Sequence, residues 1–346
     1  MSEPMHENLI RPDLVGPALA RALADPGWER FDAELVAGGK SNLTFILTSE
    51  AGTAVLRRPP SGPLLPRAHD MAREARIQRA LAGTSVPVPA ILFQESTGDL
   101  IGVPFYVMEK VDGYVVRNAL PDGYAQSAQD RREIADVLID TLADLHAVAP
   151  AEVGLADLGR PDGYAERQVR RWSDQWERSK FRDVPALDEL ARLLRADPPA
   201  GRGGAIVHGD FRLDNCIMAP QLPPSVAAVL DWELATLGDP LADLGLSLFY
   251  WREQGEPVPV LTPAPSMLPG FPPRSYLAER YAKRTGADLS DLTSWVALAH
   301  FKSAVVAQGI AARVQAGSMA GQEFGDIGAE VDRIAAEGLA LLTEGS

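Results

Sequence analysis

The chain of 346 residues has little cysteine and fewer basic than acidic residues. Its single cysteine, Cys216, excludes a framework of internal disulfides and fits a reducing compartment, where we expect it to be buried as a small apolar group. With 33 Lys and Arg against 47 Asp and Glu, the net charge is -14. Phosphate backbones are held by clusters of Lys and Arg, so we expect no nucleic-acid partner.

Long apolar runs are also missing from the sequence. No apolar segment approaches the roughly 20 residues that span a bilayer, and residues 1–11 lack the basic-then-apolar pattern of a signal peptide. We therefore expect a cytoplasmic protein without a membrane partner. Because 46% of the residues are hydrophobic, the chain can fill a sizeable core, and its length favours two lobes or two domains.

What is present is a set of acidic and amide residues in two neighbouring runs, His-Gly-Asp-Phe-Arg-Leu-Asp-Asn at 208–215 and Val-Leu-Asp-Trp-Glu at 229–233. Phosphoryl transfer to a hydroxyl needs an Asp that accepts the proton, an Asn five positions later for Mg²⁺, and an acidic residue on the next hairpin that completes the metal site. Asp210, Asn215 and Asp231 have this order, which caps and turns alone seldom give. The runs predict a catalytic base, Asp210, and two metal ligands, Asn215 and Asp231.

A basic residue accompanies the predicted base. Arg212 lies two positions after Asp210, where a cation would meet the transferring phosphoryl group, so we predict that it is catalytic. His208 alone supplies too few ligands for a metal site, and we expect it to pin the loop.

The first third of the chain predicts strands around one helix. Strand-forming residues fill 31–36 and 44–48, and the turn between them contains Gly39, Lys40, Ser41 and Asn42. Backbone amides of such a turn can cover nucleotide phosphates, although an ordinary hairpin would have the same pattern. The turn is not a P-loop, because that motif needs a glycine where this chain has Glu34.

A third strand, 53–57, ends at a cation, which is Arg57 or Arg58, and a helix follows at 67–81. On that helix Glu74 shares an apolar stripe with Ile77 and Leu81. A carboxylate that faces inward needs a partner, so we predict an ion pair between Glu74 and Arg57 rather than a solvated face.

Two further strands are predicted at 91–94 and 104–110, and the chain after them is predicted to be mainly helical. Extended backbone around Glu109 and Val111 could present amide and carbonyl groups to an adenine ring, although a plain strand between lobes has the same sequence pattern. A stripe of apolar residues predicts a helix that ends near His146, for which a structural role is favoured.

The motifs at 208–215 and 230–233, together with Gly-Asp-Pro-Leu-Ala-Asp-Leu-Gly at 238–245, resemble those of aminoglycoside phosphotransferase-type small-molecule kinases. The resemblance implies an α+β, protein-kinase-like bilobal fold, with a small N-terminal β-sheet lobe containing one helix (1–110) and a larger, mainly helical C-terminal lobe (111–346). It also implies ATP and Mg²⁺ as cofactors. Asp239 and Asp243 are expected to hold the loop and the start of the next helix.

Other segments resemble the branch of this family that includes kinase domains fused to some acyl-CoA dehydrogenases. They are Gly-Lys-Ser-Asn-Leu-Thr at 39–44, Val-Leu-Arg-Arg-Pro-Pro at 55–60, Gly-Phe-Pro at 270–272 with Arg274, Phe-Lys at 301–302, and Gln-Gly-Ile at 308–310 with Arg313. Where the wider family has a lysine on the third strand, this chain and that branch have Arg57, which keeps the charge but changes the geometry.

The resemblance implies transfer of the γ-phosphoryl group of ATP to a hydroxyl of a small molecule. A hydroxyacyl-CoA or a similar metabolite is the first choice of acceptor and an aminoglycoside the second. The alternative is a nucleotide-binding module without catalysis, because an arginine at position 57 need not orient phosphates as a lysine does. The sequence leaves the acceptor, the choice of ATP or GTP and the oligomeric state open.

Overall fold

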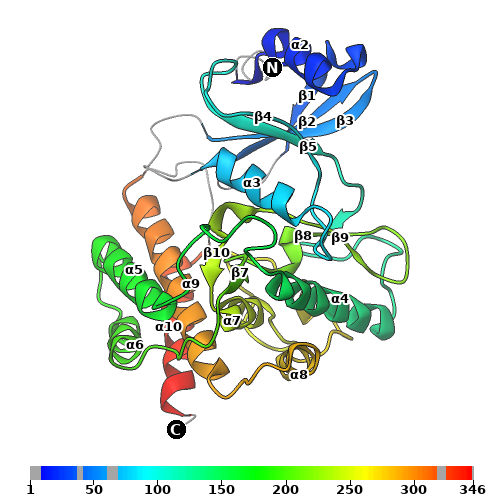
Figure 1. Ribbon diagram of the computed structural model, residues 1–346. Helices are drawn as coiled ribbons and strands as arrows, with labels where there is room; N and C mark the ends of the chain where they lie inside the picture. The colour runs from blue at the N-terminus through cyan, green and yellow to red at the C-terminus, as the bar shows by residue number, and fades with distance from the viewer. Residues whose placement is uncertain (1–8, 37–41, 61–68, 318–324, 345–346) are drawn as a thin grey trace. The chain divides into compact units, whose positions relative to one another are not determined.

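The computed structural model describes residues 9–36, 42–60, 69–317 and 325–344 (Figure 1). The chain forms two compact units. Unit 1 contains residues 1–113 and 227–233, and unit 2 contains residues 114–226 and 234–346. The sequence predicts one boundary between the lobes, near residue 110. In the structure, the segment 227–233 also belongs to unit 1.

Unit 1 is built on a five-stranded antiparallel sheet in the order β1-β2-β3-β5-β4. Its strands are β1 (Asp32–Leu35), β2 (Leu43–Ser49), β3 (Gly52–Arg58), β4 (Ile91–Glu95) and β5 (Phe105–Glu109). These are the five strands that the sequence predicts. Alternation of side chains between the two faces gives the sheet two apolar surfaces, and each is covered by a helix.

Two helices cover the sheet of unit 1, one on each face (Figure 1). α2 (Pro12–Leu23) packs on Phe45, Leu56 and Phe105 through Val15 and Leu19. α3 (Met71–Leu81) covers the opposite face, and it begins after Asp70, whose side chain accepts the backbone N–H of Arg73 as an N-cap. α3 was predicted and α2 was not.

Unit 2 is mainly helical, as predicted. Its helices are α4 (Ala128–Ala147), α5 (Tyr164–Ser179), α6 (Pro185–Ala196), α7 (Pro240–Tyr250), α8 (Arg274–Thr285), α9 (Leu292–Gln315) and α10 (Ile327–Thr343). The short strands β7 (Ala205–Val207) and β10 (Thr236–Gly238) pair antiparallel, as do β6 (Tyr114–Val115) and β8 (Cys216–Met218). β9 (Val226–Val229) overlaps the segment 227–233 of unit 1.

α9 packs against α5, α7 and α10 within unit 2 (Figure 1). The contact with α7 is close at Gly245, where an added Cβ would lie 2.9 Å from the carbonyl carbon of Trp295. In the part of the chain that the structure describes, α9 alone has the length and mean hydropathy (1.2) of a bilayer span, but 61% of its apolar window is buried inside the fold. Core helices of soluble proteins share this character, and a cytoplasmic location stays a prediction.

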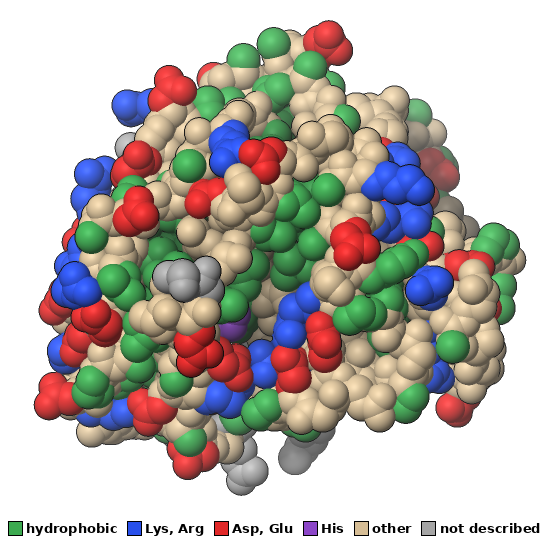
Figure 2. Space-filling view, turned by 90° about the horizontal axis from the view of Figure 1, so that it is seen from below, with side chains coloured by type: hydrophobic (Ala, Val, Ile, Leu, Met, Phe, Trp, Pro, Cys, Tyr) green, Lys and Arg blue, Asp and Glu red, His purple; other side chains and the backbone are tan. Residues whose placement is uncertain are grey.

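Acidic residues of α4 pair at regular intervals with polar and basic residues of α8. Three acidic residues of α4, four positions apart, each contact a residue of α8 in the same order: Asp136 with Tyr276, Asp140 with Arg280, and Asp144 with Arg284. Such pairs are typical of the surface seen in Figure 2, where acidic and basic side chains lie next to one another.

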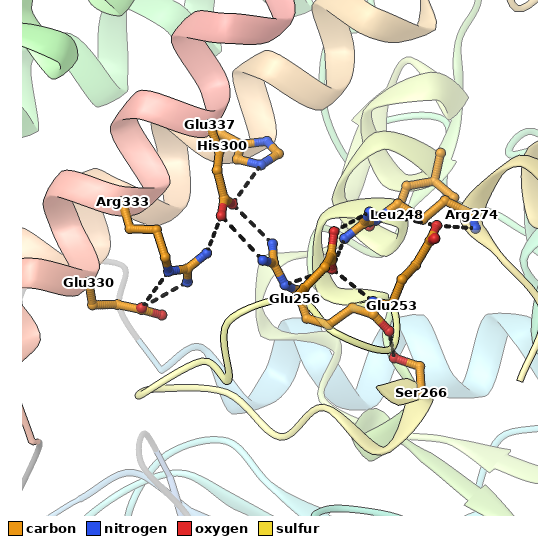
Figure 3. Close-up of polar contacts among 10 residues, drawn as sticks. Leu248, Glu253, Glu256, Ser266, Arg274, His300, Glu330, Arg333 and Glu337 are labelled. Atoms are coloured by element: carbon orange, nitrogen blue, oxygen red, sulfur yellow. Dashed lines mark hydrogen bonds and ion pairs between the residues drawn. The ribbon is translucent and has the colours of Figure 1, made fainter. Parts of the chain in front are cut away.

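A second polar network ties α10 to the segment that follows α7 (Figure 3). Glu337 of α10 accepts hydrogen bonds from Arg252 (3.0 Å) and Arg333 (2.6 Å) and lies 3.6 Å from His300 of α9. Arg252 also lies 3.1 Å from Glu256, which Arg274 contacts in turn. Because Arg252 is only 4% exposed, the carboxylates of this network supply the counter-charge that a buried guanidinium needs.

Candidate active site

The loop that carries Asp210 begins where β7 ends, in unit 2. A short 3-10 helix (Leu213–Asn215) turns the chain back so that the Asn215 amide donates to the Asp210 backbone carbonyl at 2.8 Å and to its Oδ2 at 3.1 Å. The other carboxylate oxygen, Oδ1, accepts a hydrogen bond from the Tyr250 hydroxyl at 2.9 Å. Both oxygens of the predicted base are therefore held in place.

One face of α7 holds this loop. Asp243, Ser247 and Tyr250 are spaced at i, i+4 and i+7, so they lie on one stripe of the helix. The Asp243 carboxylate accepts the backbone N–H groups of His208 (2.5 Å) and Gly209 (2.8 Å), and the Ser247 hydroxyl donates to the Phe211 carbonyl (2.8 Å). This confirms that Asp243 holds the loop.

Other predicted supports of the loop are also in place. Asp239 caps the start of α7 through the N–H of Leu241 and accepts the N–H of Arg202, as expected. His208 contacts the loop backbone, since its Nδ1 accepts the N–H of Asp210 at 3.2 Å. Gly209 has a φ of +83°, and an added Cβ there would lie 2.8 Å from the carbonyl oxygen of Leu234, so only glycine fits.

The charges around Asp210 favour its ionised form. Burial acts to raise its pKa, but the Arg212 guanidinium, the Lys302 ammonium and His208 together hold that pKa below its usual range. Arg212 Nε lies 3.3 Å from Asp210 and 3.2 Å from Asp214, and its guanidinium lies 4.9 Å from the centre of the Tyr250 ring. An ionised, desolvated carboxylate is suited to accept a proton.

In unit 1 the second group of predicted site residues surrounds Arg57. Its guanidinium lies 3.1 Å from Glu74 and forms a short contact with Asp231, so the ion pair predicted between Arg57 and Glu74 is present. The Glu74 carboxylate also accepts hydrogen bonds from the Asn42 amide (3.1 Å) and the Tyr106 hydroxyl (3.0 Å). Burial raises the pKa of Glu74 to about 7, although Arg57 opposes the shift.

Asp231 stands at a special backbone position. Its φ of +67° lies in the left-handed region, which Asp and Asn tolerate better than most residues. Its Oδ1 contacts Arg57, and its side chain is 30% exposed. The carboxylate of Asp231 suits a hard cation such as Mg²⁺, as does the Asn215 side-chain oxygen, because the Asn215 amide nitrogen is the atom committed to Asp210.

The described part of the chain contains no metal cluster of the usual kind. No group of three or more His, Cys, Asp or Glu residues with a metal-binding arrangement occurs among the described residues. Asn215 lies in unit 2 and Asp231 in unit 1. Their assignment as metal ligands stays a prediction.

The remaining predicted nucleotide contacts are in unit 1. Gly39, Lys40 and Ser41 lie outside the described residues. Glu109 ends β5, where its N–H donates to the carbonyl of Ala90 at 2.8 Å, and Val111 follows two residues later. Their predicted contact with an adenine ring is not tested by these positions.

Two residues next to Asp210 were not predicted from the sequence. Tyr250 bonds its carboxylate, and Lys302 donates to the Gly209 carbonyl at 2.7 Å. A usable signal existed for Tyr250, since it lies seven positions after Asp243 on the same helix. Lys302 is separated from the loop by 93 residues, and no spacing rule connects the two.

A protein with this two-unit fold and this loop belongs to the class of phosphotransferases. The model of the phosphotransferase enzyme family (APH) matches residues 32–264, and the chain belongs to this family. A solved structure of a putative aminoglycoside phosphotransferase from Ralstonia eutropha is 31% identical, with a TM-score of 0.83 over 96% of this chain and 98% of that one. The predicted α+β, kinase-like fold is confirmed.

More distant structures share the fold. An aminoglycoside phosphotransferase, APH(4)-Ia, in a ternary complex with ADP and hygromycin B, has a TM-score of 0.61 at 14% identity, over 95% of this chain and 99% of that one. At this identity only the fold is shared.

Curated relatives confirm the predicted branch. Acyl-CoA dehydrogenase family member 11 of Rattus norvegicus is 38% identical over 308 residues, which cover 88% of this chain and 39% of the relative. The human protein of the same name is 37% identical over 82% of this chain and 36% of its own length. The chain thus corresponds to well under half of each of these relatives.

Proposed function

We propose that this phosphotransferase moves the γ-phosphoryl group of ATP to a hydroxyl of a small molecule, with Asp210 as the base. The observation that carries the proposal is the environment of Asp210, whose carboxylate is ionised and held at both oxygens by Tyr250 and Asn215. In the reaction the acceptor oxygen forms a bond to the γ-phosphorus, the bond to the bridging oxygen of ADP breaks, and the hydroxyl proton passes to Asp210.

Mg²⁺ is the proposed cofactor, with Asn215 and Asp231 as its ligands. When bound, it neutralises charge on the phosphate oxygens. Arg57 would contribute a further positive charge, and Glu74 would orient it through the ion pair described above. Nucleotide complexes of other family members, such as the ADP complex of APH(4)-Ia, support a nucleotide as phosphoryl donor.

The acceptor that we propose first is a hydroxyacyl-CoA or a similar metabolite. Support comes from the relatives, which carry the name acyl-CoA dehydrogenase, and from their identity to this chain over most of its length. An aminoglycoside is the second choice, supported by the names of the structural neighbours. A screen of both acceptor classes with radiolabelled ATP separates them.

Replacement of the base tests the proposal. Asp210→Asn should reduce phosphoryl transfer at least about a hundredfold, while thermal unfolding and ATP binding stay close to those of the unchanged chain. Transfer at the original rate by Asp210→Asn would refute the role of Asp210.

One observation favours a second candidate, a nucleotide-binding module without catalysis. Arg57 engages Asp231, the residue proposed to hold the metal. Calorimetry with ATP distinguishes the two candidates. Binding that requires Mg²⁺ and weakens in Asp231→Asn supports the kinase, whereas binding that is indifferent to Mg²⁺ supports the module. Asn is the suitable replacement because it also tolerates the backbone at this position.

A further inference from the structure

A small cavity of about 40 Å³ lies in unit 2 beside the loop of Asp210. Its walls come from α5, α7, α9 and the loop, and they include Trp172, Gly209, Asp243, Trp295 and Lys302. A cavity needs about 10–15 Å³ of this kind of space to hold one water molecule. This one therefore has room for a small polar group.

Two cations lie near the ring of Trp172: Lys302, which lines the cavity, and Arg171, which is exposed and lies outside its lining. The Lys302 ammonium lies 5.8 Å, and the Arg171 guanidinium 5.1 Å, from the centre of the Trp172 ring. Among the described residues, neither cation has a carboxylate within 4 Å. Burial lowers the pKa of Lys302, and although Asp210 and Asp243 oppose this, the Arg171 charge adds to it. Two like charges that lack an ion pair among the described residues favour a bound anion.

A second tryptophan of α5, Trp176, also has a lysine over its ring and can be compared with Trp172. Lys180 lies 5.2 Å from the centre of the Trp176 ring, and its ammonium forms an ion pair of 2.9 Å with Asp188. Lysine over tryptophan is thus found twice in unit 2. Only the lysine at Trp176 forms an ion pair with a carboxylate; Lys302, at Trp172, forms none with a described residue.

Trp295 supplies a second, independent sign of a ligand. It is 1% exposed, it lines the cavity, and its indole N–H has no hydrogen-bond partner among the described residues. A buried donor without a partner is costly. Asp243 also lines the cavity, but its carboxylate oxygens accept the N–H groups of His208 and Gly209. The Trp295 N–H and the Lys302 ammonium are therefore donors on this wall that can face an anion.

We propose that Lys302, Arg171 and the Trp295 N–H form an oxyanion site that binds a phosphate or carboxylate group of the acceptor. The inference rests on the proposed function and narrows its substrate class to hydroxyl compounds that carry a negative charge. Charge-assisted hydrogen bonds from ammonium and guanidinium groups are the usual means of holding such groups.

The site is coupled to the base through Lys302. Its ammonium donates to the carbonyl of Gly209, directly before Asp210, and its charge helps to hold the pKa of Asp210 low.

Inorganic phosphate, titrated by calorimetry at constant ionic strength in the presence of a metal chelator, tests the site. The unchanged chain should bind phosphate saturably. Lys302→Met should weaken this binding about tenfold or more, since it removes a charged hydrogen-bond donor, and Lys302→Arg should restore most of it. Lys180→Met is the matched control and should bind as the unchanged chain does.

A further variant tests the site if Lys302→Met is unstable. If Lys302→Met does not fold, Arg171→Met serves instead, because Arg171 is exposed. Absence of saturable binding to the unchanged chain, or equal binding by every variant, would overturn the inference.

ATP binding on the same samples separates this inference from the proposed function. Lys302→Met should bind ATP and Mg²⁺ as before and, in transfer assays, should raise the KM of a charged acceptor without changing that of ATP. Loss of ATP binding by Lys302→Met would assign Lys302 to the nucleotide and refute the acceptor site. Failure of the unchanged chain to bind ATP would refute the kinase instead.

Discussion

Arg57 forms ion pairs with two carboxylates, those of Glu74 and Asp231. We therefore expect the stability of unit 1 to depend strongly on this residue. Glu74 is 1% exposed, so it depends on Arg57 for neutralisation. Removal of one partner of a buried ion pair leaves the other charge uncompensated, which costs about 3–5 kcal/mol. We predict a loss of this size in the free energy of unfolding for Arg57→Met, measured by urea denaturation.

The double variant tests the cause of that loss. Arg57→Met combined with Glu74→Gln should recover part of the stability, because the buried carboxylate is gone. If the two substitutions instead destabilise additively, the ion pair is not what Arg57 contributes.

Tyr250 gives a functional prediction at the same scale. Tyr250→Phe removes the hydroxyl that donates to Asp210, so the pKa of Asp210 should rise, and the acid limb of the transfer rate should move to higher pH. We expect a loss of about tenfold in kcat. Tyr276→Phe removes a similar bond to Asp136, between α8 and α4, and should leave the pH profile as it is. An unshifted profile in Tyr250→Phe would contradict this role.

At the scale of elements, the backbones of α7 and α9 come close together at Gly245. A Cβ at this position meets the rigid backbone of Trp295, so Gly245→Ala should force the helices apart and cost about 1–3 kcal/mol. At Gly309, within α9, an added Cβ would have only a side-chain atom of Gln175 near it, at 3.9 Å. Gly309→Ala should stabilise the chain by up to about 1 kcal/mol through helix propensity. Thermal unfolding of the two variants should shift in opposite directions, and shifts of the same sign would contradict the packing argument.

Sequence patterns predicted most elements because their signals are local. The strands of unit 1 alternate in burial, and α3 has a clear apolar stripe. α2 was missed because Pro12 and Pro17 in a short segment suggest a loop, whereas both prolines are tolerated in a helix whose buried face covers the sheet. Packing on Phe45 and Leu56 outweighs the low helix propensity there.

At the scale of the whole molecule, the network around Glu337 links three parts of unit 2 and should control acid stability. Burial opposes it, but hydrogen bonds from His300, Arg252 and Arg333 hold the pKa of Glu337 well below its usual value of 4.5. A lowered carboxyl pKa contributes stability above pH 4.5 that is lost as the pH falls below that value.

Glu337→Gln should therefore destabilise the chain by about 2 kcal/mol at pH 7 and flatten the decline in stability below pH 4.5. Chemical denaturation at a series of pH values measures both effects. Glu189→Gln breaks only the exposed pair with Arg192 and serves as the control. Parallel acid profiles for Glu337→Gln and the unchanged chain would show that the network does not set acid stability.

The sequence predicted those contacts of the site whose residues lie close together in the chain. Asp210 and Asn215 form one loop, and five positions suffice to define their relation. The ion pair of Arg57 and Glu74 followed from an inward carboxylate and a nearby cation. Lys302 and the network of Glu337 join segments far apart in the chain, and their contacts follow from tertiary packing that no local pattern encodes.

Unit 1 takes its last segment, 227–233, from the middle of the chain, after 113 residues of unit 2. During synthesis the N-terminal sheet leaves the ribosome long before Asp231. Arg57 and Glu74 are therefore made well before Asp231, the third residue of their cluster. A fragment cut at residue 113 would lack that member permanently. The N-terminal lobe is therefore complete only after most of the chain between residues 114 and 233 has been synthesised.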